Sequence, residues 1–168
     1  SGTYRWHYSL LPRDNMPFNQ EGIADLDGDG NFEVITAHRD GLLRAFNSKA
    51  GNQLCPTCEP ETELTPYNRS AVERWTHKIT GAINPSVYRS DQDFATVDLD
   101  GDGAMEILIG DGEGTLYALK EKNGVCTTLW KLSIITRRLG SPVVADIDGD
   151  DQGEILIPSE DGIIHCLK

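Results

Sequence analysis

An acidic nonapeptide occurs three times in this chain of 168 residues and limits its fold more than any other feature. The copies span residues 25–33, 98–106 and 146–154, and each has carboxylates at positions 1, 3, 5 and 9. A small or turn-tolerant residue at position 4 or 6 predicts a tight loop, in which four carboxylates repel one another. A hard divalent cation relieves that repulsion, and oxygen ligands in a flexible geometry favour calcium over zinc or magnesium. The pattern therefore predicts three calcium-binding loops.

An EF-hand loop opens with the same Asp-x-Asp-x-Asp-Gly pattern, but it ends with a bidentate Glu at position 12 between two helices. Position 12 is Thr36, Ile109 or Ile157 here, so every copy lacks that ligand. The flanking residues are β-branched and apolar, as in 106–109, and lack the period of an amphipathic helix. The EF-hand is therefore excluded, and three copies in register disfavour a plain Asp-Gly turn without metal.

A second signal follows each loop at a fixed distance. A Gly preceded by an acidic residue lies 16 residues after the first Asp, at Gly41, Gly114 and Gly162. Such pairs are typical of hairpin turns, and short apolar segments lie before the loop and on both sides of the turn. Each unit is therefore expected to run strand, calcium loop, strand, turn, strand.

Three tryptophans predict a fourth strand in each unit, in the segments 4–8, 73–77 and 128–132. Four short antiparallel strands, repeated at about fifty residues, describe a β-propeller blade. The predicted fold class is all-β, with three four-stranded repeat units that form an incomplete propeller within one chain. Trp6, Trp75 and Trp130 are expected to pack between neighbouring blades rather than to stack ligands.

The chain is expected to be one repeat domain over residues 1–168. Its predicted parts are an outer strand that completes a blade (1–10), blade 1 with an inserted loop at 51–70 (21–80), blade 2 (92–136), and blade 3 without its outer strand (140–168). Closed propellers use about 4–8 blades, so three are too few to close a ring. Either the chain belongs to a larger propeller, or the first strand of one copy completes the last blade of the next, head to tail. The second arrangement forms a ring or a filament.

The inserted loop contains the sequence Cys55-Pro-Thr-Cys58. Such a pair can be half a zinc site, a redox dithiol or a short disulfide. The chain offers no second suitably spaced pair and no βαβ context, which favours a disulfide between Cys55 and Cys58. Cys166 occupies the repeat position of Ala45 and Ala118, so we expect a small buried thiol there.

Charge, hydropathy and the expected calcium affinity limit the partners and the cellular location of the protein. The net charge of −12 argues against a nucleic-acid partner, and no apolar run approaches the length of a membrane span. Calcium sites of extracellular modules bind with dissociation constants of about 10⁻⁴ to 10⁻³ M, which favours an extracellular, cell-surface or periplasmic protein. Asn68 begins an N-glycosylation sequon and is a candidate for modification in a secretory pathway.

The sequence predicts no catalytic residue. Its histidines fall on different strands and turns, without an accompanying Ser, Cys or acid motif: His7, His38, His77 and His165. His38 takes the turn position of Asp111 and Ser159, and we expect it at the surface. The protein is therefore not expected to be an enzyme.

The repeat resembles the FG-GAP/VCBS family, which includes the calcium-loop blades of the integrin α-subunit propeller. Residues 25–30, 98–103 and 146–150 carry the resemblance, whereas the family's Phe-Gly and Gly-Ala-Pro signatures are absent. The strand after the turn is also similar to quinoprotein-type blades. Asp151 replaces Gly at position 6 of the third loop, where a left-handed backbone is expected.

The resemblance implies metal ligands at the side chains of positions 1, 3, 5 and 9 and at the carbonyl of position 7. These residues are Asp25, Asp27, Asp29, Asn31 and Glu33; Asp98, Asp100, Asp102, Ala104 and Glu106; and Asp146, Asp148, Asp150, Gln152 and Glu154. It implies a module that uses three structural calcium ions and serves adhesion, self-assembly or the binding of a protein or glycan. The alternative is a non-catalytic fragment of a larger propeller enzyme, such as a polysaccharide lyase or a quinoprotein.

Overall fold

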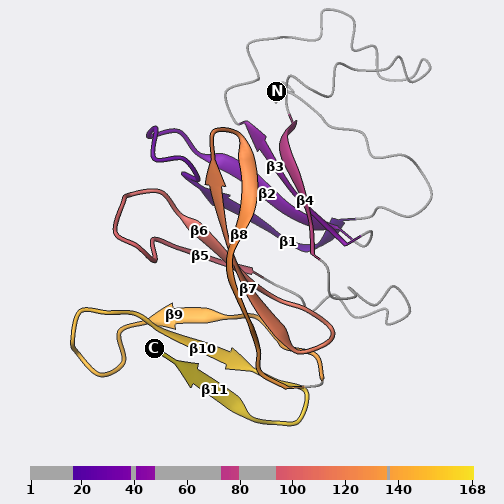
Figure 1. Cartoon of the computed structure of the whole chain (residues 1–168), viewed down its shortest axis with the longest axis vertical. Helices are drawn as coiled ribbons and strands as arrows, with labels where there is room; N and C mark the ends of the chain where they lie inside the picture. The colour runs from indigo at the N-terminus through magenta and orange to yellow at the C-terminus, as the bar shows by residue number, and fades with distance from the viewer. Residues whose placement is uncertain (1–16, 39–40, 48–72, 80–93, 136) are drawn as a thin grey trace, which may run out of the picture.

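A computed structural model describes residues 17–38, 41–47, 73–79, 94–135 and 137–168 of this protein. These segments contain eleven β-strands and no helix, so the all-β expectation is confirmed for them. They also contain no helix of the length and apolar character that crossing a membrane requires. The strands form three antiparallel sheets, and the second sheet lies between the other two (Figure 1).

The three sheets use their strands in sequence order. Sheet 1 consists of β1 (Pro17–Ala24), β2 (Glu33–His38), β3 (Leu42–Asn47) and β4 (Glu73–Lys78). Sheet 2 consists of β5 (Phe94–Val97), β6 (Glu106–Gly110), β7 (Thr115–Lys122) and β8 (Val125–Ser133). Sheet 3 consists of β9 (Val143–Ala145), β10 (Glu154–Pro158) and β11 (Ile164–Leu167).

The order of strands within each unit agrees with the sequence expectation. An acidic loop joins the first two strands of every sheet, and the acidic-Gly turn joins the second and third. The fourth strands predicted around Trp75 and Trp130 are β4 and β8. Residues 1–10 with Trp6, and the inserted loop 51–70 with Cys55, Cys58 and Asn68, lie outside the described residues.

Strand register repeats from sheet to sheet. Equivalent cross-strand pairs are Ile35–Ala45, Leu108–Ala118 and Leu156–Cys166. Side chains alternate between the two faces of a strand, so each pair lies on the corresponding face of its own sheet. We call this the forward face, because in sheets 1 and 2 it packs against the sheet that follows in sequence.

Two apolar cores hold the three sheets together. Ile35 and Leu43 of sheet 1 are buried in one cluster with Ile107 and Ile109 of sheet 2. On the other side of sheet 2, Leu108 joins a second cluster with residues of sheet 3. Strand β6 is therefore buried on both faces, which explains its unbroken apolar run between Glu106 and Gly110.

The forward face of sheet 3 is not covered by any described residue. Its Val143 is 55% exposed and its Ile164 is 70% exposed, whereas Leu116, the equivalent of Ile164 in sheet 2, is 0% exposed. Cys166 on this face is an exposed free thiol, so the expectation of a buried thiol is wrong. The small residue at this position is buried in sheets 1 and 2 only because the next sheet lies over it.

The tryptophans differ in the same way. Trp75 is 6% exposed, and its Nε1–H donates a hydrogen bond of 2.6 Å to Oε2 of Glu121 in sheet 2, which confirms packing between sheets. Trp130 is 37% exposed, so that expectation fails for β8 within the described structure. Sheet 3 offers no outer strand, among the residues described, against which Trp130 could pack.

Candidate metal centres

The first Asp of each acidic loop organises the loop backbone. Asp25 Oδ1 accepts hydrogen bonds from the N–H groups of Gly28 (2.8 Å) and Asp29 (3.1 Å), and its Oδ2 accepts one from Gly30 (2.8 Å). Asp146 accepts the three equivalent bonds in its own loop, and Asp98 accepts those from Gly101 and Gly103. Donated N–H groups stabilise the charged carboxylate, and those of Asp151 and Gly149 lower the pKa of Asp146.

Positive φ angles make this tight winding feasible. Positions 4 and 6 of the first loop are Gly28 and Gly30, with φ of 73° and 79°. Asp151 occupies position 6 of the third loop with φ of 65°, so the left-handed backbone expected there is confirmed. An Asp tolerates this conformation better than most residues with a side chain, but less well than Gly.

The Glu at position 9 closes each loop from the start of the following strand. One of its oxygens accepts a hydrogen bond from the N–H of position 2: 3.1 Å from Leu26 to Glu33, 2.7 Å from Leu99 to Glu106, and 2.9 Å from Ile147 to Glu154. These three Glu residues are 2%, 0% and 3% exposed. Burial raises the pKa of Glu33 above its usual value, although the Leu26 N–H and Arg74 act in the opposite direction.

The second oxygen of this carboxylate marks the interior of the loop. Oε1 of Glu106 and Oε1 of Glu154 are buried and accept no hydrogen bond. Lys120 Nζ lies 2.8 Å from the former and Lys168 Nζ lies 3.3 Å from the latter, as ion pairs outside hydrogen-bonding geometry. In both loops an ammonium group therefore already faces this buried oxygen, which indicates that the loop interior favours a cation.

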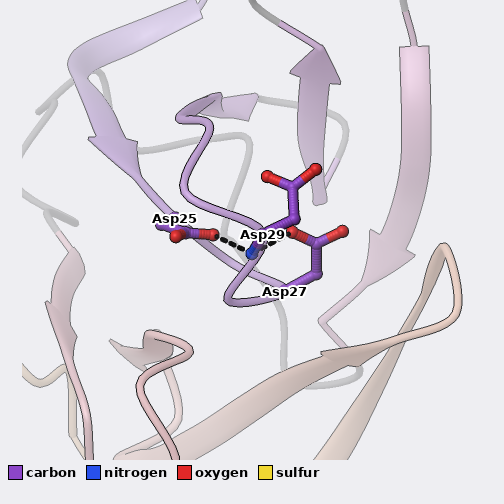
Figure 2. Close-up of side chains that lie close together, drawn as sticks. All are labelled: Asp25, Asp27 and Asp29. Carbon is purple, nitrogen blue, oxygen red and sulfur yellow. Dashed lines mark hydrogen bonds between the residues drawn. The ribbon is translucent and has the colours of Figure 1, made fainter.

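The structure brings three of the predicted side chains together in each loop. Their ligand atoms lie within 4.8 Å of one another, in the groups Asp25–Asp27–Asp29, Asp98–Asp100–Glu106 and Asp146–Asp148–Glu154. Figure 2 shows the first group, with the Asp29 N–H between the carboxylates of Asp25 and Asp27. Carboxylate oxygens in such groups suit calcium better than zinc, which prefers nitrogen and sulfur.

The remaining predicted side-chain ligands are not members of these groups. Glu33 of the first loop lies 3.5 Å from Arg74, while Asp102 and Asp150 are not members of their loops' groups. The N–H groups of Asn31, Ala104 and Gln152 donate to the position-5 carboxylates at 2.8, 3.0 and 3.0 Å. Metal coordination by the carbonyls of these three residues stays a prediction.

Three cationic side chains at the loops were not identified from the sequence. They are Arg74, Lys120 and Lys168. Lys120 and Lys168 each follow the last apolar residue of the third strand, so comparison of the repeats at this position could have found them. Burial acts to lower the pKa of Lys120, but its interactions with Asp100, Asp102 and Glu106 outweigh burial and raise the pKa.

A second polar group lies in the hairpin turns and is structural. Asp111 is 0% exposed and accepts hydrogen bonds from the Thr115 N–H (2.8 Å) and the Tyr117 hydroxyl (3.1 Å). This turn position is therefore buried in sheet 2. The surface location expected for its counterpart His38 stays a prediction, because that side chain lies outside the described structure. The hydrogen bonds show that the position fastens the turn to the third strand.

Sheet 3 has a Ser and a His in the equivalent places. Ser159 Oγ lies 3.1 Å from Nε2 of His165, a pairing that could suggest a nucleophile and its base. However, the neighbouring Asp161 bonds to Ser159 rather than to the imidazole, and Ser159 Oγ also bonds to the Ile163 carbonyl at 3.0 Å. The imidazole is therefore not oriented as in a Ser-His-Asp triad, and these side chains stabilise the turn instead.

Fold and loops together define a class: antiparallel repeat units in which an acidic, oxygen-rich loop joins the first two strands. Residues 98–157 match the family model described as FG-GAP-like repeat, so this segment is an FG-GAP-like repeat and the resemblance is confirmed there. The matched segment holds the second and third acidic loops and strands β6 to β9, with most of β10. No curated protein matches the chain.

Proposed function

We propose that this chain is a calcium-stabilised β-propeller module, with its three sheets as blades, that serves extracellular binding or assembly rather than catalysis. One repeated observation carries the proposal. In every loop one oxygen of the buried position-9 Glu accepts the position-2 N–H. In the second and third loops its other oxygen accepts no hydrogen bond and belongs to a carboxylate grouped with positions 1 and 3. The cation now facing that oxygen is a lysine ammonium, and a calcium ion in its place would coordinate the oxygen and neutralise the group.

The contacts between sheets support the blade arrangement. The first strands of successive sheets contact each other, β1 with β5 and β5 with β9, and the outer strands β4 and β8 also touch. Sheets that share neighbours in this radial way are typical of propellers. The expected calcium affinity and the FG-GAP-like segment support the proposed extracellular location.

Calcium is proposed to stabilise the folded state and to take no part in a reaction. An ion that binds only the folded chain adds about 1.4 kcal/mol per site at ten times its dissociation constant. The melting temperature of the chain should therefore rise with calcium concentration in the millimolar range and fall when a chelator is added.

A thermal melting series tests this proposal. The unmodified chain is compared with E106Q, which keeps the shape of the side chain but removes the charge, and with E113Q, which removes a charge from the exposed turn of the same sheet. Calcium should raise the midpoint of the unmodified chain and of E113Q, and raise that of E106Q less. Equal midpoints in calcium, magnesium and chelator would refute the proposal.

Assembly is proposed to use the forward face of sheet 3. The corresponding faces of sheets 1 and 2 are buried by a following sheet, while this face exposes Val143 and Ile164. Exposed apolar side chains on one face of a sheet are candidates for an interaction site. The proposed partner is a second copy of this chain, and a glycan or another protein is a further candidate for the same module.

A further inference from the structure

In the second acidic loop a lysine ammonium lies among the proposed calcium ligands. Lys120 Nζ is 2.7 Å from Oδ2 of Asp100, 2.8 Å from Oδ2 of Asp102 and 2.8 Å from Oε1 of Glu106. The Lys120 side chain is 15% exposed, so most of it is covered by the protein. It contacts the carboxylates at positions 3, 5 and 9, and two of these, Asp100 and Glu106, belong to the group that could hold a metal ion.

The third loop repeats this arrangement with different residues. Lys168 Nζ is 2.8 Å from Asp148, 2.6 Å from Asp150 and 3.3 Å from Glu154, which are again positions 3, 5 and 9. Strand register explains the recurrence. Leu119 pairs with Ile107 and Leu167 pairs with Ile155, so the residue that follows each Leu lies opposite the position-9 Glu.

The first loop has no lysine at this place. Asn47 stands there, and Arg74 of β4 reaches the acidic side chains from the neighbouring strand, at 3.5 Å from Glu33 and in contact with Asp27. Arg74 is also anchored by Asn47 at 3.1 Å and by Glu121 of sheet 2 at 2.5 Å. Its position is therefore tied to the contact between sheets 1 and 2.

We propose that Lys120 and Lys168 are tethered cations that take the calcium position in the ion-free protein, and that calcium binds only by displacing them. The inference rests on the proposed function and deepens it, because it assigns these lysines control over calcium affinity. An ammonium and a divalent ion cannot share the same few oxygens, since the two cations repel at such distances. Each lysine thus lowers calcium affinity while it prevents the carboxylates of the ion-free loop from repelling one another.

The magnitude follows from a two-state argument. If the ammonium occupies the position in about nine of ten molecules, the apparent dissociation constant of calcium is about tenfold larger than without the lysine. Replacing Lys120 by Met keeps an unbranched chain along the loop and removes the charge. K120M should therefore bind calcium about tenfold more tightly at that loop, and its melting temperature in chelator should be lower.

Calorimetric titration with calcium and melting in chelator, both on the full chain, test the inference. The matched control is K122M, which removes one positive charge two residues along β7, where Lys122 is exposed and pairs with Val125. Calcium should bind more tightly at one of the three acidic loops in K120M, at two of the three in a K120M/K168M double variant, and at none in K122M. A gain in affinity together with a lower melting temperature in chelator supports the tethered cation.

Two results would count against it in distinguishable ways. Calcium binding to K120M no tighter than to K122M would overturn the inference and leave the proposed function standing. No calcium binding to any variant would overturn the proposed function itself. Binding by K120M but not by the unmodified chain would support the tethered cation but contradict the proposed function, in which calcium stabilises the unmodified chain.

Discussion

At the scale of single residues, the acidic loops depend on a division of labour between two carboxylates. The position-1 Asp binds loop N–H groups, as Asp25 does with Gly28 and Gly30, and so fixes the shape of the turn. The position-9 Glu binds one N–H and keeps an oxygen for the loop interior. Four carboxylates in nine residues therefore do not act alike: one shapes the loop, one closes it, and those at positions 3 and 5 face the lysine in the second loop.

Asp151 is the one residue in these loops that has a side chain and also a positive φ angle. Its φ of 65° suits Gly, and the second loop has Gly103 there, with φ of 88° and open space within 4 Å of where a Cβ would lie. We expect D151G to stabilise the chain by about 0.5 kcal/mol, since relief of about 1–2 kcal/mol of left-handed strain exceeds the entropic cost of Gly. The reverse change, G103D, should destabilise it. Denaturant unfolding measures both.

A control variant separates the effect of backbone conformation on stability from the effect of the Asp151 charge. D151N removes the negative charge but keeps a residue that tolerates the left-handed region. If the gain from D151G reflects the backbone, D151N should reproduce little of it in chelator. An equal gain from both variants would show that the charge of Asp151, and not its φ angle, limits the stability of the third loop.

At the scale of elements, the hairpin turns have similar sequences but differ in what packs against them in the fold. Gly114 and Gly162 occupy equivalent turns with φ of 87° and 84°. A Cβ at Gly162 would meet nothing within 4 Å, whereas one at Gly114 would overlap the carbonyl oxygen of Ile135. The Gly114 carbonyl also accepts a hydrogen bond of 2.8 Å from the Ile134 N–H. The turn of sheet 2 is thus a docking point for the segment that leads to sheet 3.

Alanine substitutions at Gly114 and Gly162 give a matched test of the contact between the sheet 2 turn and the segment that leads to sheet 3. G162A should cost about 1 kcal/mol, because only the left-handed backbone is penalised. G114A should cost about 2–4 kcal/mol, because a further 1–3 kcal/mol of steric overlap is added and backbone atoms must move. Chemical denaturation of the two variants and the unmodified chain measures the difference. Equal losses would show that the linker relaxes without cost.

At the scale of the whole molecule, the two ends of the stack of sheets are not complementary. The forward face of sheet 3 exposes apolar side chains, including Ile164. On the opposite end, Thr36, Arg44 and Phe46 lie on the outer face of sheet 1 and are 8%, 7% and 4% exposed. Exposed apolar side chains are therefore available on the sheet 3 face and not at these three residues of sheet 1. Two copies are better able to associate through their sheet 3 faces, in a two-fold contact.

We accordingly predict concentration-dependent dimers whose contact includes Ile164. I164E should weaken dimerisation at least about tenfold, because a charge would be buried in the contact. V125E places the same charge at a 58% exposed position at the far end of β8 and should leave dimerisation unchanged. Sedimentation equilibrium measures the association. An unmodified chain that stays monomeric at every concentration would contradict the prediction.

The sequence by itself determined the repeat, the loop and the left-handed turn. The spacing of Asp25, Gly28 and Glu33 and its two copies predicted loops between strands, since local hydrogen bonds and φ angles are set by residues near in sequence. Only the tertiary structure decided what each repeat packs against. It exposed Cys166, buried Trp75 on Glu121 and brought Lys120 to a loop 18 residues away. These outcomes depend on strand register and on the presence of a following sheet, and identical local patterns in the three repeats carry no information about either.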